Sequence, residues 1–360
     1  MPSTNKSRTT ALSSIRTDPR TQQPIILDQS KLPFSIEERA ICSVEDAATA
    51  IRSMQVRGAP LIGVAAAYGV ALAMDSDNSD TSLSSAIALL AKTRPTAVNL
   101  AWALKVMHDV LSPLLPSERR KAAWATCNKM AAEDVSTNLR IGQHGLELLK
   151  ELHRQLARPL NILTHCNAGS LACVAYGTAL APIYLAAEEK FPVHVYVDET
   201  RPRNQGLLTA LELGRAGISH SYIVDNAGGR LMQQGKIDLV IVGADRVARN
   251  GDAANKIGTY LKALAAKDCA VPFYVALPSS TIDWSLPNGS LIEIEERSGD
   301  EVRFVRGVNC QGVASEVRLL AETSQVENPA FDVTPARLIT GIITELGVVA
   351  PAGLAAQFGQ

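Results

Sequence analysis

The second half of the chain alternates short apolar segments with helical stretches, and this rhythm limits the fold more than any other feature of the sequence. Strands that alternate with helices indicate βα units and a parallel sheet. A strand that is apolar throughout, such as Leu239–Val242, is typical of a sheet with helices on both faces. Residues 158–360 are therefore predicted to form an α/β, Rossmann-like domain with a mostly parallel, doubly wound sheet. The predicted strands are Asn161–His165, Val193–Glu199, Ser221–Asp225, Asp238–Gly243, Pro272–Pro278 and a late segment around Val333.

The first half has a different pattern. From Ser43 to about Ala157, apolar residues recur at three- and four-residue spacing, which predicts amphipathic helices. Residues 23–157 are expected to form one mostly helical N-terminal domain. Residues 1–22 are rich in Ser, Thr and charge and lack an apolar period, so a flexible arm is expected there. Polar breaks interrupt the helices at Arg57–Pro60 and Thr93–Thr96, where an arginine is more often solvated than functional.

Charge and composition exclude several classes of function. Lys and Arg total 35 against 36 Asp and Glu, and no basic block contains interleaved aromatic residues, so no binding of nucleic acid is expected. The longest apolar run, Leu61–Met74, is too short to span a bilayer, and the N-terminus lacks the apolar segment of a signal peptide. A cytoplasmic protein that does not bind membranes is therefore expected.

The usual signatures of a nucleotide or metal cofactor are missing. No G-x-G-x-x-G follows the first predicted strand, and no G-x-x-x-x-G-K-[ST] occurs, so neither a dinucleotide nor a nucleoside triphosphate is indicated. The six cysteines form no C-x-x-C pair, and the histidines show no ligand spacing. We expect reduced thiols, no metal and no cofactor.

Cys166 follows the first predicted strand in a His-Cys-Asn-Ala-Gly turn, after which the chain is expected to continue as a helix. Free N–H groups and the helix dipole at such a turn favour a thiolate and also hold phosphate oxygens. The alternative is a small buried cysteine that fills the junction, and a lone cysteine favours that alternative. His165 points to the opposite face of the strand and is expected to be packed or hydrogen-bonded.

Asp245 follows the apolar strand Leu239–Val242. Ligands of open α/β sheets bind outside the carboxyl ends of the strands, so Cys166 and Asp245 are expected to face one crevice. Asn255 and Lys256 are expected to open the next helix, where a lysine suits a phosphate. The alternatives are a turn or N-cap role for Asp245 and a solvated position for Lys256.

A dense polar cluster, residues 198–206, follows the strand Val193–Glu199 and is expected at the same edge of the sheet. Its arginines and Gln205, beside a thiol and a carboxylate, suit a polyhydroxylated phosphate ester. The alternative is a turn that local ion pairs stabilise.

Long segments occur in one order and at consistent spacing from about Leu27 to Val349. They are VRGAPLIGVAAAYG, RPTAVNLAWAL, THCNAGSLA, VDETRPRNQGLLTALEL, GADRVARNGDAANKIGTY, PFYVALPSSTID, IEERS and VTPARLITGIITE. Together they resemble the methylthioribose-1-phosphate isomerase family of methionine salvage, whose superfamily includes the alpha, beta and delta regulatory subunits of eukaryotic initiation factor two-B. The resemblance implies a helical N-terminal domain with a small sheet, a Rossmann-like C-terminal domain, a homodimer and no cofactor.

The resemblance also implies functional residues. Cys166 and Asp245 match the catalytic pair of the family. The residues that match its substrate-binding positions are Arg57, Gly58, Ala59, Arg94, Gln205, Asn255 and Lys256. One departure is Ala227, which stands where the family usually has a methionine, and we expect it to reshape the pocket wall.

The implied reaction converts 5-methylthioribose 1-phosphate into 5-methylthioribulose 1-phosphate. Because phosphate blocks the anomeric oxygen, the furanose ring cannot open unaided. Asp245 is expected to protonate the ring oxygen, which requires that burial raise its pKa above about 3.9. Cys166 then acts at C2, either by removing the proton as a thiolate or beside a hydride shift from C2 to C1, and the sequence leaves both routes open.

Two other functions are compatible with the resemblance. A ribose 1,5-bisphosphate isomerase would share the thiol and the carboxylate but would need more cations at the 5-position, where a methylthio group needs an apolar wall. A non-catalytic regulatory subunit is the third possibility. The presence of both Cys166 and Asp245 argues against it, because a scaffold has no need of that pair.

Overall fold

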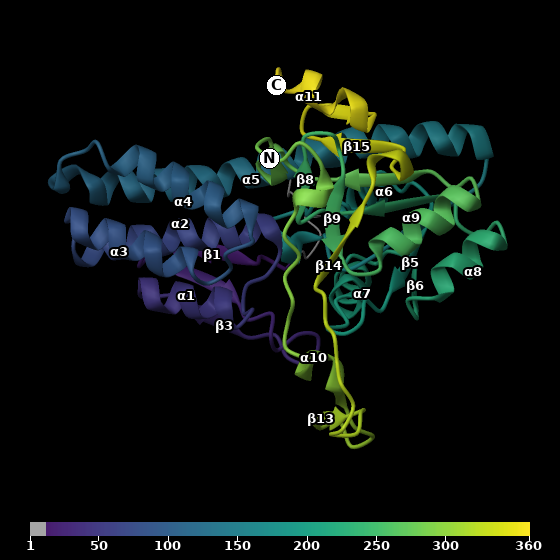
Figure 1. Ribbon diagram of the computed structural model, residues 1–360, viewed down its shortest axis with the longest axis horizontal. Coiled ribbons are helices and arrows are strands. Elements are labelled where there is room, and N and C mark those ends of the chain that lie inside the picture. The colour runs from purple at the N-terminus through teal and green to yellow at the C-terminus, as the bar shows by residue number, and fades with distance from the viewer. Residues whose placement is uncertain (1–11) are drawn as a thin grey trace, which may run out of the picture.

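The computed structural model describes residues 12–360, and its N-terminal half is a layer of helices (Figure 1). Ser43 and Ser79 cap α1 and α3 by accepting a hydrogen bond from a backbone N–H of the first turn. A proline stands in the first turn of α2 and of α5, where its missing N–H costs nothing. The predicted helical region is confirmed. The helices are α1 Val44–Arg52, α2 Ala59–Ser76, α3 Asp80–Ala91, α4 Val98–Leu111 and α5 Pro116–Leu156.

A small antiparallel sheet precedes these helices. It consists of β1 Ile15–Thr17, β2 Pro24–Leu27 and β3 Glu38–Ala40. The flexible arm expected over residues 1–22 is therefore wrong where β1 lies, whereas residues 1–11 lie outside the described residues. Three residues are too few to show an alternating pattern, so the pairing of Ile15 with Ile26 could not be read from this segment alone.

A seven-stranded sheet forms the centre of the C-terminal half, and the predicted fold class is confirmed. Its strand order is β16-β15-β10-β7-β4-β5-β6, and every pair is parallel except β15 with β16. The strands are β4 Leu160–Thr164, β5 Val193–Asp198, β6 His220–Ile223, β7 Leu239–Val242, β10 Phe273–Ala276, β15 Gly341–Thr344 and β16 Gly347–Val349. Between them run α6 Ala181–Glu188, α7 Gly206–Arg215, α8 Ala227–Gln233 and α9 Thr259–Asp268.

The chain reverses direction within this sheet. From β4 it builds one side through β5 and β6, and it then returns to the other side of β4 with β7 and β10. The switch point therefore lies between β4 and β7, and Cys166 and Asp245 follow these two strands. A crevice at the carboxyl ends of such strands is the usual ligand site of an open α/β sheet.

A second sheet of four strands lies beside the first and corrects two predictions. It contains β8 Arg246–Ala248, β9 Ala253–Lys256, β11 Ile282–Asp283 and β14 Phe331–Thr334. Val333 is in a strand, as predicted, but that strand pairs antiparallel with β9 outside the main sheet. Asn255 and Lys256 lie in β9 and do not open a helix, since α9 begins only at Thr259.

The remaining elements are short. The strands β12 Phe304–Val308 and β13 Ala314–Arg318 form a hairpin that projects from the body of the molecule (Figure 1). The helix α10 Asp300–Arg303 precedes the hairpin, and α11 Leu354–Gln357 ends the chain.

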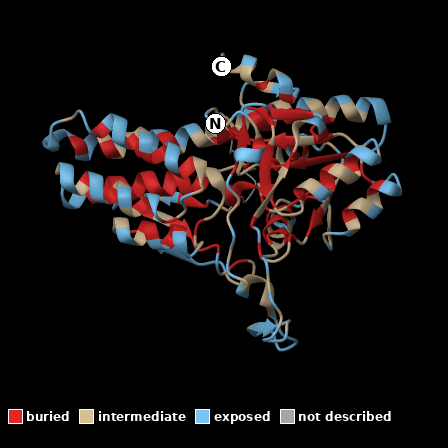
Figure 2. Cartoon of the chain, viewed as in Figure 1, coloured by how far each residue is buried: buried red, intermediate tan, exposed pale blue. Residues whose placement is uncertain are grey.

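Buried residues form separate cores in the helical layer and around the main sheet (Figure 2). The long helix α5 contributes to both, with Ala123 and Met130 in the helical core and Ile141 and Leu149 in the core of the sheet. The domain boundary at residue 157 stays a prediction, because one continuous helix joins the two cores.

Among the described residues, α2 is the one helix that is long and apolar enough to cross a membrane. It is 83% buried and packs against α1, α3, α4 and α5. A helix that is apolar on all sides is what the centre of a helical layer requires.

Candidate active site

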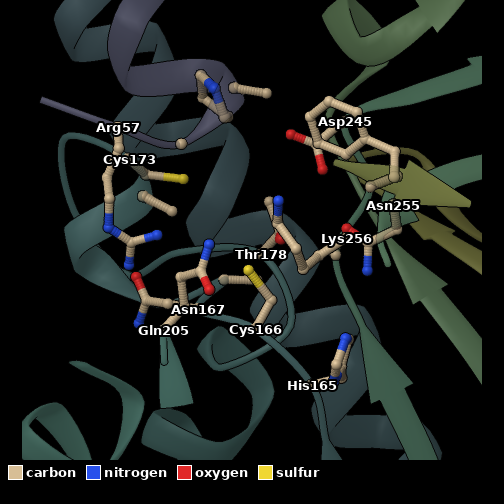
Figure 3. Close-up of a pocket in the computed structure, with 18 of the residues that line it drawn as sticks. Arg57, His165, Cys166, Asn167, Cys173, Thr178, Gln205, Asp245, Asn255 and Lys256 are labelled. Carbon is tan, nitrogen blue, oxygen red and sulfur yellow. The ribbon is translucent and has the colours of Figure 1, made fainter. Parts of the chain in front are cut away.

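All nine residues that the family resemblance implied for the site line one pocket between the helical layer and the main sheet, whereas Arg201 and Arg203 do not line it. Figure 3 shows Arg57 and Gln205 together on one side of this pocket, Asp245 on the other, and Cys166 and Lys256 between them. The lining residues among those predicted are Arg57, Gly58, Ala59, Arg94, Cys166, Gln205, Asp245, Asn255 and Lys256. The fold therefore brings together segments that are almost 200 residues apart in sequence, from Arg57 to Lys256.

The backbone of Cys166 is held from both sides in an unusual conformation. Its φ is 64°, in the left-handed region that residues other than glycine rarely adopt. The N–H of Cys166 donates to Thr200 Oγ1 at 2.8 Å, and its carbonyl accepts from Thr209 Oγ1 at 2.8 Å. These two threonines, from the turn after β5 and from α7, aim the thiol into the pocket. Strain that neighbouring groups maintain in this way is common at functional sites.

The expected helix after Cys166 is wrong. Only one 3₁₀ turn, Ser170–Ala172, follows, and the next α-helix is α6. Buried carboxylates take the N–H groups that a helix would have used, because Glu212 accepts from Leu171 at 2.8 Å and Asp134 accepts from Val174 at 2.7 Å. The dipole of a following helix therefore does not act on the thiol.

The thiol of Cys166 is more basic than the sequence analysis expected. Burial raises its pKa, and the positive charges of Arg57 and Lys256 offset this only in part. The expectation of a thiolate favoured in the free protein is wrong in direction, because desolvation outweighs the two cations.

The helix that does face the pocket is α2. Gly58, at its N-cap, has a φ of 96°, and a Cβ there would lie 2.4 Å from backbone atoms of Ala172. Only glycine permits this approach. It places the first backbone N–H groups of α2, next to Arg57, against the segment that carries Cys166. A helix N-terminus beside an arginine is suited to a phosphate.

Asp245 lies directly after β7, and its own N–H donates to Ala254 of β9 at 2.9 Å. Burial raises the pKa of its carboxyl, although Lys256, Arg94 and Arg297 lower it and Glu295 raises it. The direction agrees with the requirement for a carboxylic acid that donates a proton near neutral pH.

The arginines of the pocket differ in their pairing. Arg94 Nη2 and Arg297 Nη2 both contact Glu295 Oε2, at 3.0 and 3.2 Å. Arg57 has no carboxylate partner among the described residues, and its Nε and Nη2 are buried without a hydrogen bond. Of the three arginines in the pocket, Arg57 is therefore the one best suited to bind an anion.

Lys256 is buried in β9, in contrast to the solvated alternative. Its Nζ donates to the carbonyl of Ala330 at 2.8 Å and lies 4.7 Å from the ring centroid of Phe331. Burial, with the nearby charge of Arg297, lowers the pKa of Lys256 to about 8.

Several lining residues were not predicted from the sequence, and three of them carry polar or aromatic groups that bear on the chemistry: Asn167, Arg297 and Phe331. Arg297 lies in IEERS, one of the segments that carry the family resemblance, and that segment was the available signal. Phe331 lies outside those segments, and pairing of β14 with β9 brings it opposite Lys256. Asn167 stands beside Cys166 in the sequence, and this position was the available signal.

A buried polar group lies behind Cys166 and includes His165, Asp198 and Asp225, whose ligand atoms are close enough together to hold a metal ion. The cation already present there is Lys262, whose Nζ lies 2.8 Å from Asp198 Oδ2. His165 Nε2 is 2.9 Å from the carbonyl of Ile257, and burial lowers the histidine pKa well below its usual range. His165 is therefore a neutral, hydrogen-bonded residue, as expected.

Ala227 does not line this pocket in the described part of the chain. It begins α8, whose neighbours Asp225, Asn226 and Gly229 line a different hollow near α9. The expected effect of Ala227 on the pocket wall is therefore wrong.

Comparisons with known proteins agree on one family. The model of the Initiation factor 2 subunit family matches residues 55–351. A protein of Dechloromonas aromatica (strain RCB) named methylthioribose-1-phosphate isomerase is 56% identical over 335 residues, which cover 93% of this chain and 92% of that protein.

Two solved structures have the same fold. That of 5-methylthioribose 1-phosphate isomerase from Pyrococcus horikoshii OT3 superposes with a TM-score of 0.83 at 38% identity, covering 98% of this chain and 96% of the other. That of the translation initiation factor eIF-2B subunit delta from A. fulgidus has a TM-score of 0.79 at 37% identity, covering 97% and 100%.

Proposed function

The chain belongs to the Initiation factor 2 subunit family, and on this premise we propose that it isomerises 5-methylthioribose 1-phosphate to 5-methylthioribulose 1-phosphate. The observation that carries the proposal is the pocket at the switch point. There a half-buried cysteine, a carboxylic acid of raised pKa and an arginine without a carboxylate partner line one cavity. An enzyme that isomerises an aldose 1-phosphate needs three such groups: a cation for the phosphate, an acid for the ring oxygen and a group that acts at C2.

The phosphate binds to Arg57 and to the N-terminal N–H groups of α2 at Gly58 and Ala59. Binding of an anion supplies hydrogen bonds to the Arg57 nitrogens that have none in the free protein. Lys256, which lies between Arg57 and Asp245 in Figure 3, adds a second positive charge. Arg94 has a lesser part, because Glu295 already balances its charge.

Asp245 donates a proton to the ring oxygen while the bond between C1 and that oxygen breaks. The raised pKa keeps the proton on Asp245 in a larger fraction of molecules than at an exposed aspartate. The open chain then has an electron-poor C1 that still carries phosphate.

Cys166 acts at C2 by one of two routes. As a thiolate it removes the C2 proton and, as the thiol, returns a proton at C1, or it lies beside a hydride that moves from C2 to C1. In both routes the C2 hydroxyl gives up its proton to the Asp245 carboxylate, which restores the acid and leaves the C2 carbonyl.

The raised pKa of Cys166 makes the thiolate the minor form in the free protein. Proton removal from C2 therefore requires that a neighbouring group accept the thiol proton, or that substrate binding lower the pKa of Cys166. Substrate with deuterium at C2 separates the routes, because a hydride shift retains all of the label in the product, whereas a thiol that exchanges with solvent before it protonates C1 loses part or all of it.

The pairing of the arginines favours a monophosphate over ribose 1,5-bisphosphate. Of the three arginines in the pocket, two share Glu295, which leaves Arg57 and the α2 N-terminus for one phosphate group. A second dianion would have to break these ion pairs, whereas a methylthio group gains about 1–3 kcal/mol on burial.

The test compares both sugars as substrates of the purified protein, with formation of the ketose 1-phosphate as the signal. We expect kcat/KM to be at least ~10²-fold higher for the methylthio compound. A preference for the bisphosphate would reassign the enzyme. Inactivity on both sugars, together with tight binding of a nucleotide or of a protein partner, would favour the regulatory alternative.

Two further expectations stay predictions. A homodimer would give twice the chain mass of 38.4 kDa in light scattering after size exclusion. Cell fractionation would test the cytoplasmic location.

A further inference from the structure

Asn167 is a buried asparagine in the pocket wall whose amide nitrogen is fully engaged. The residue is 5% exposed. Its Nδ2 donates to Thr209 Oγ1 at 3.1 Å and to Glu212 Oε2 at 2.5 Å. An amide nitrogen has two protons, so these two bonds use both.

The neighbours determine which end of the amide is nitrogen. Thr209 Oγ1 donates its proton to the carbonyl of Cys166, so towards Asn167 it can only accept. Glu212 Oε1 receives Ser170 Oγ at 2.6 Å and the N–H of Leu171 at 2.8 Å. Burial raises the pKa of Glu212, whereas these donors and the charge of Arg57 oppose burial and favour the ionised carboxylate, so Oε2 is taken as an acceptor towards Asn167. A rotated amide would set its oxygen against two acceptors.

The amide oxygen of Asn167 is left without a partner. Among the described residues no donor reaches Oδ1, although the atom is buried and the residue lines the same pocket as Cys166 and Asp245. Buried carbonyl oxygens are nearly always hydrogen-bonded in native proteins. The missing donor is therefore expected to belong to the ligand.

Few groups of a sugar phosphate can act as this donor. An amide oxygen accepts hydrogen bonds and donates none, so an ionised phosphate has nothing to offer it. A sugar hydroxyl is a donor of the right kind. Asn167 is adjacent to Cys166, which acts at C2, so the hydroxyl within reach is one near that carbon.

We propose, on the basis of the function given above, that Asn167 is a specificity-determining residue whose Oδ1 accepts a hydrogen bond from the C2 or C3 hydroxyl of the substrate. Glu212 and Thr209 are the positioning residues that orient the amide. Asn167 thereby distinguishes a ribose from a deoxyribose 1-phosphate, whereas the cations of the pocket recognise only its phosphate.

The experiment measures discrimination between sugars. Wild type, Asn167→Ala and the control Ser170→Ala are compared on 5-methylthioribose 1-phosphate and its 3-deoxy analogue by kcat/KM. Inhibition by the 2-deoxy analogue, which cannot form the ketose, is measured alongside. Ser170→Ala removes one donor to Glu212 and leaves Asn167 Oδ1 in place.

We expect the wild type to prefer the parent sugar over one of the two analogues by ~10–100-fold, which also identifies the hydroxyl. Asn167→Ala should lose at least ~10-fold of that preference, and Ser170→Ala should keep it even if its activity or stability falls. Unchanged preferences for both analogues in Asn167→Ala would overturn the proposal.

Two safeguards keep the outcome decisive. If Asn167→Ala does not fold, as judged by its thermal unfolding, Asn167→Ser replaces it, because a serine hydroxyl retains a donor towards Glu212 and removes the amide oxygen. Turnover of the parent sugar by the wild type tests the proposed function separately. If that turnover is absent, the binding affinities of the same three proteins for the three sugars are compared by calorimetry. An Asn167→Ala protein that loses the same factor in affinity for all three sugars would contradict the role of Asn167.

Discussion

The two walls of the pocket differ in whether a carboxylate balances the charge of their arginines. The Cys166 wall, formed by Arg57, Cys166, Asn167 and Gln205, has an arginine without a carboxylate partner and a thiol held by backbone hydrogen bonds. The Asp245 wall, formed by Asp245, Arg94 and Arg297, has two arginines that share the carboxylate of Glu295.

The difference shows which wall suits which part of the chemistry. An unpaired cation attracts phosphate, so the Cys166 wall is suited to binding. A carboxylic acid must not be surrounded by unbalanced positive charge, because this would lower its pKa and remove its proton. Glu295 provides that balance beside Asp245.

Loss of the thiol should have the largest effect. Cys166→Ala is expected to lower kcat by ~10³-fold or more with little change in folding, since the lost volume is small and the lost group reacts. Cys173→Ala is the matched control, because Cys173 is a second cysteine that lines the same pocket. Steady-state kinetics that leave Cys166→Ala a tenth of wild-type kcat would refute the role.

Loss of the acid on the other wall should be next in size. Asp245→Asn keeps the shape of the side chain but has no proton to transfer to the ring oxygen, so kcat should fall by at least ~10²-fold while KM changes little. If KM rises and kcat is unchanged, Asp245 positions the substrate and does not protonate it.

The arginines allow a direct comparison of the walls. Arg57→Ala is expected to raise KM by ~10–100-fold, because it removes the unpaired guanidinium. Arg94→Ala should have a several-fold smaller effect, because Glu295 already balances that charge. Equal KM values for the two variants would mean that the pairing in the free protein does not decide where phosphate binds.

The smallest expected effect is a shift in pH dependence. Asp245 must be protonated to act, so activity is present below its pKa in the complex and is lost as pH rises through it. Glu295→Gln leaves the charges of Arg94 and Arg297 unbalanced, which lowers the pKa of Asp245. The basic limb of kcat against pH should therefore move to lower pH, while it should stay in place in the exposed control Glu293→Gln. A limb that does not move, or that moves to higher pH, would contradict the balancing role.

The architecture of the site was largely predictable from local patterns. The apolar strands β4 and β7 and the polar residues after them follow from short, nearly continuous apolar runs and from the turns that end each strand. The rule that ligands bind at the carboxyl edge of the sheet then places Cys166 and Asp245 together. No contact between distant segments had to be known for this step.

Other features depended on competition between distant partners. The segment after Cys166 has sequence signals for a helix, but Glu212 and Asp134 take its N–H groups. Asn255 and Lys256 were expected to begin a helix, but the pairing of Lys256 with Phe331 makes both residues part of strand β9. In both cases hydrogen bonds to residues distant in the sequence replaced the backbone hydrogen bonds that the expected helix would have formed.

The sequence by itself determined which residues the chemistry needs and which edge of the sheet carries them. Only the tertiary structure decided the basicity of Cys166, the pairing of Arg94 with Glu295 and the orientation of the Asn167 amide. The physical reason is that strand and helix patterns report which side of a segment is buried. Charge balance and hydrogen-bond partners depend instead on distances of a few ångströms between groups that lie 40 or more residues apart along the chain.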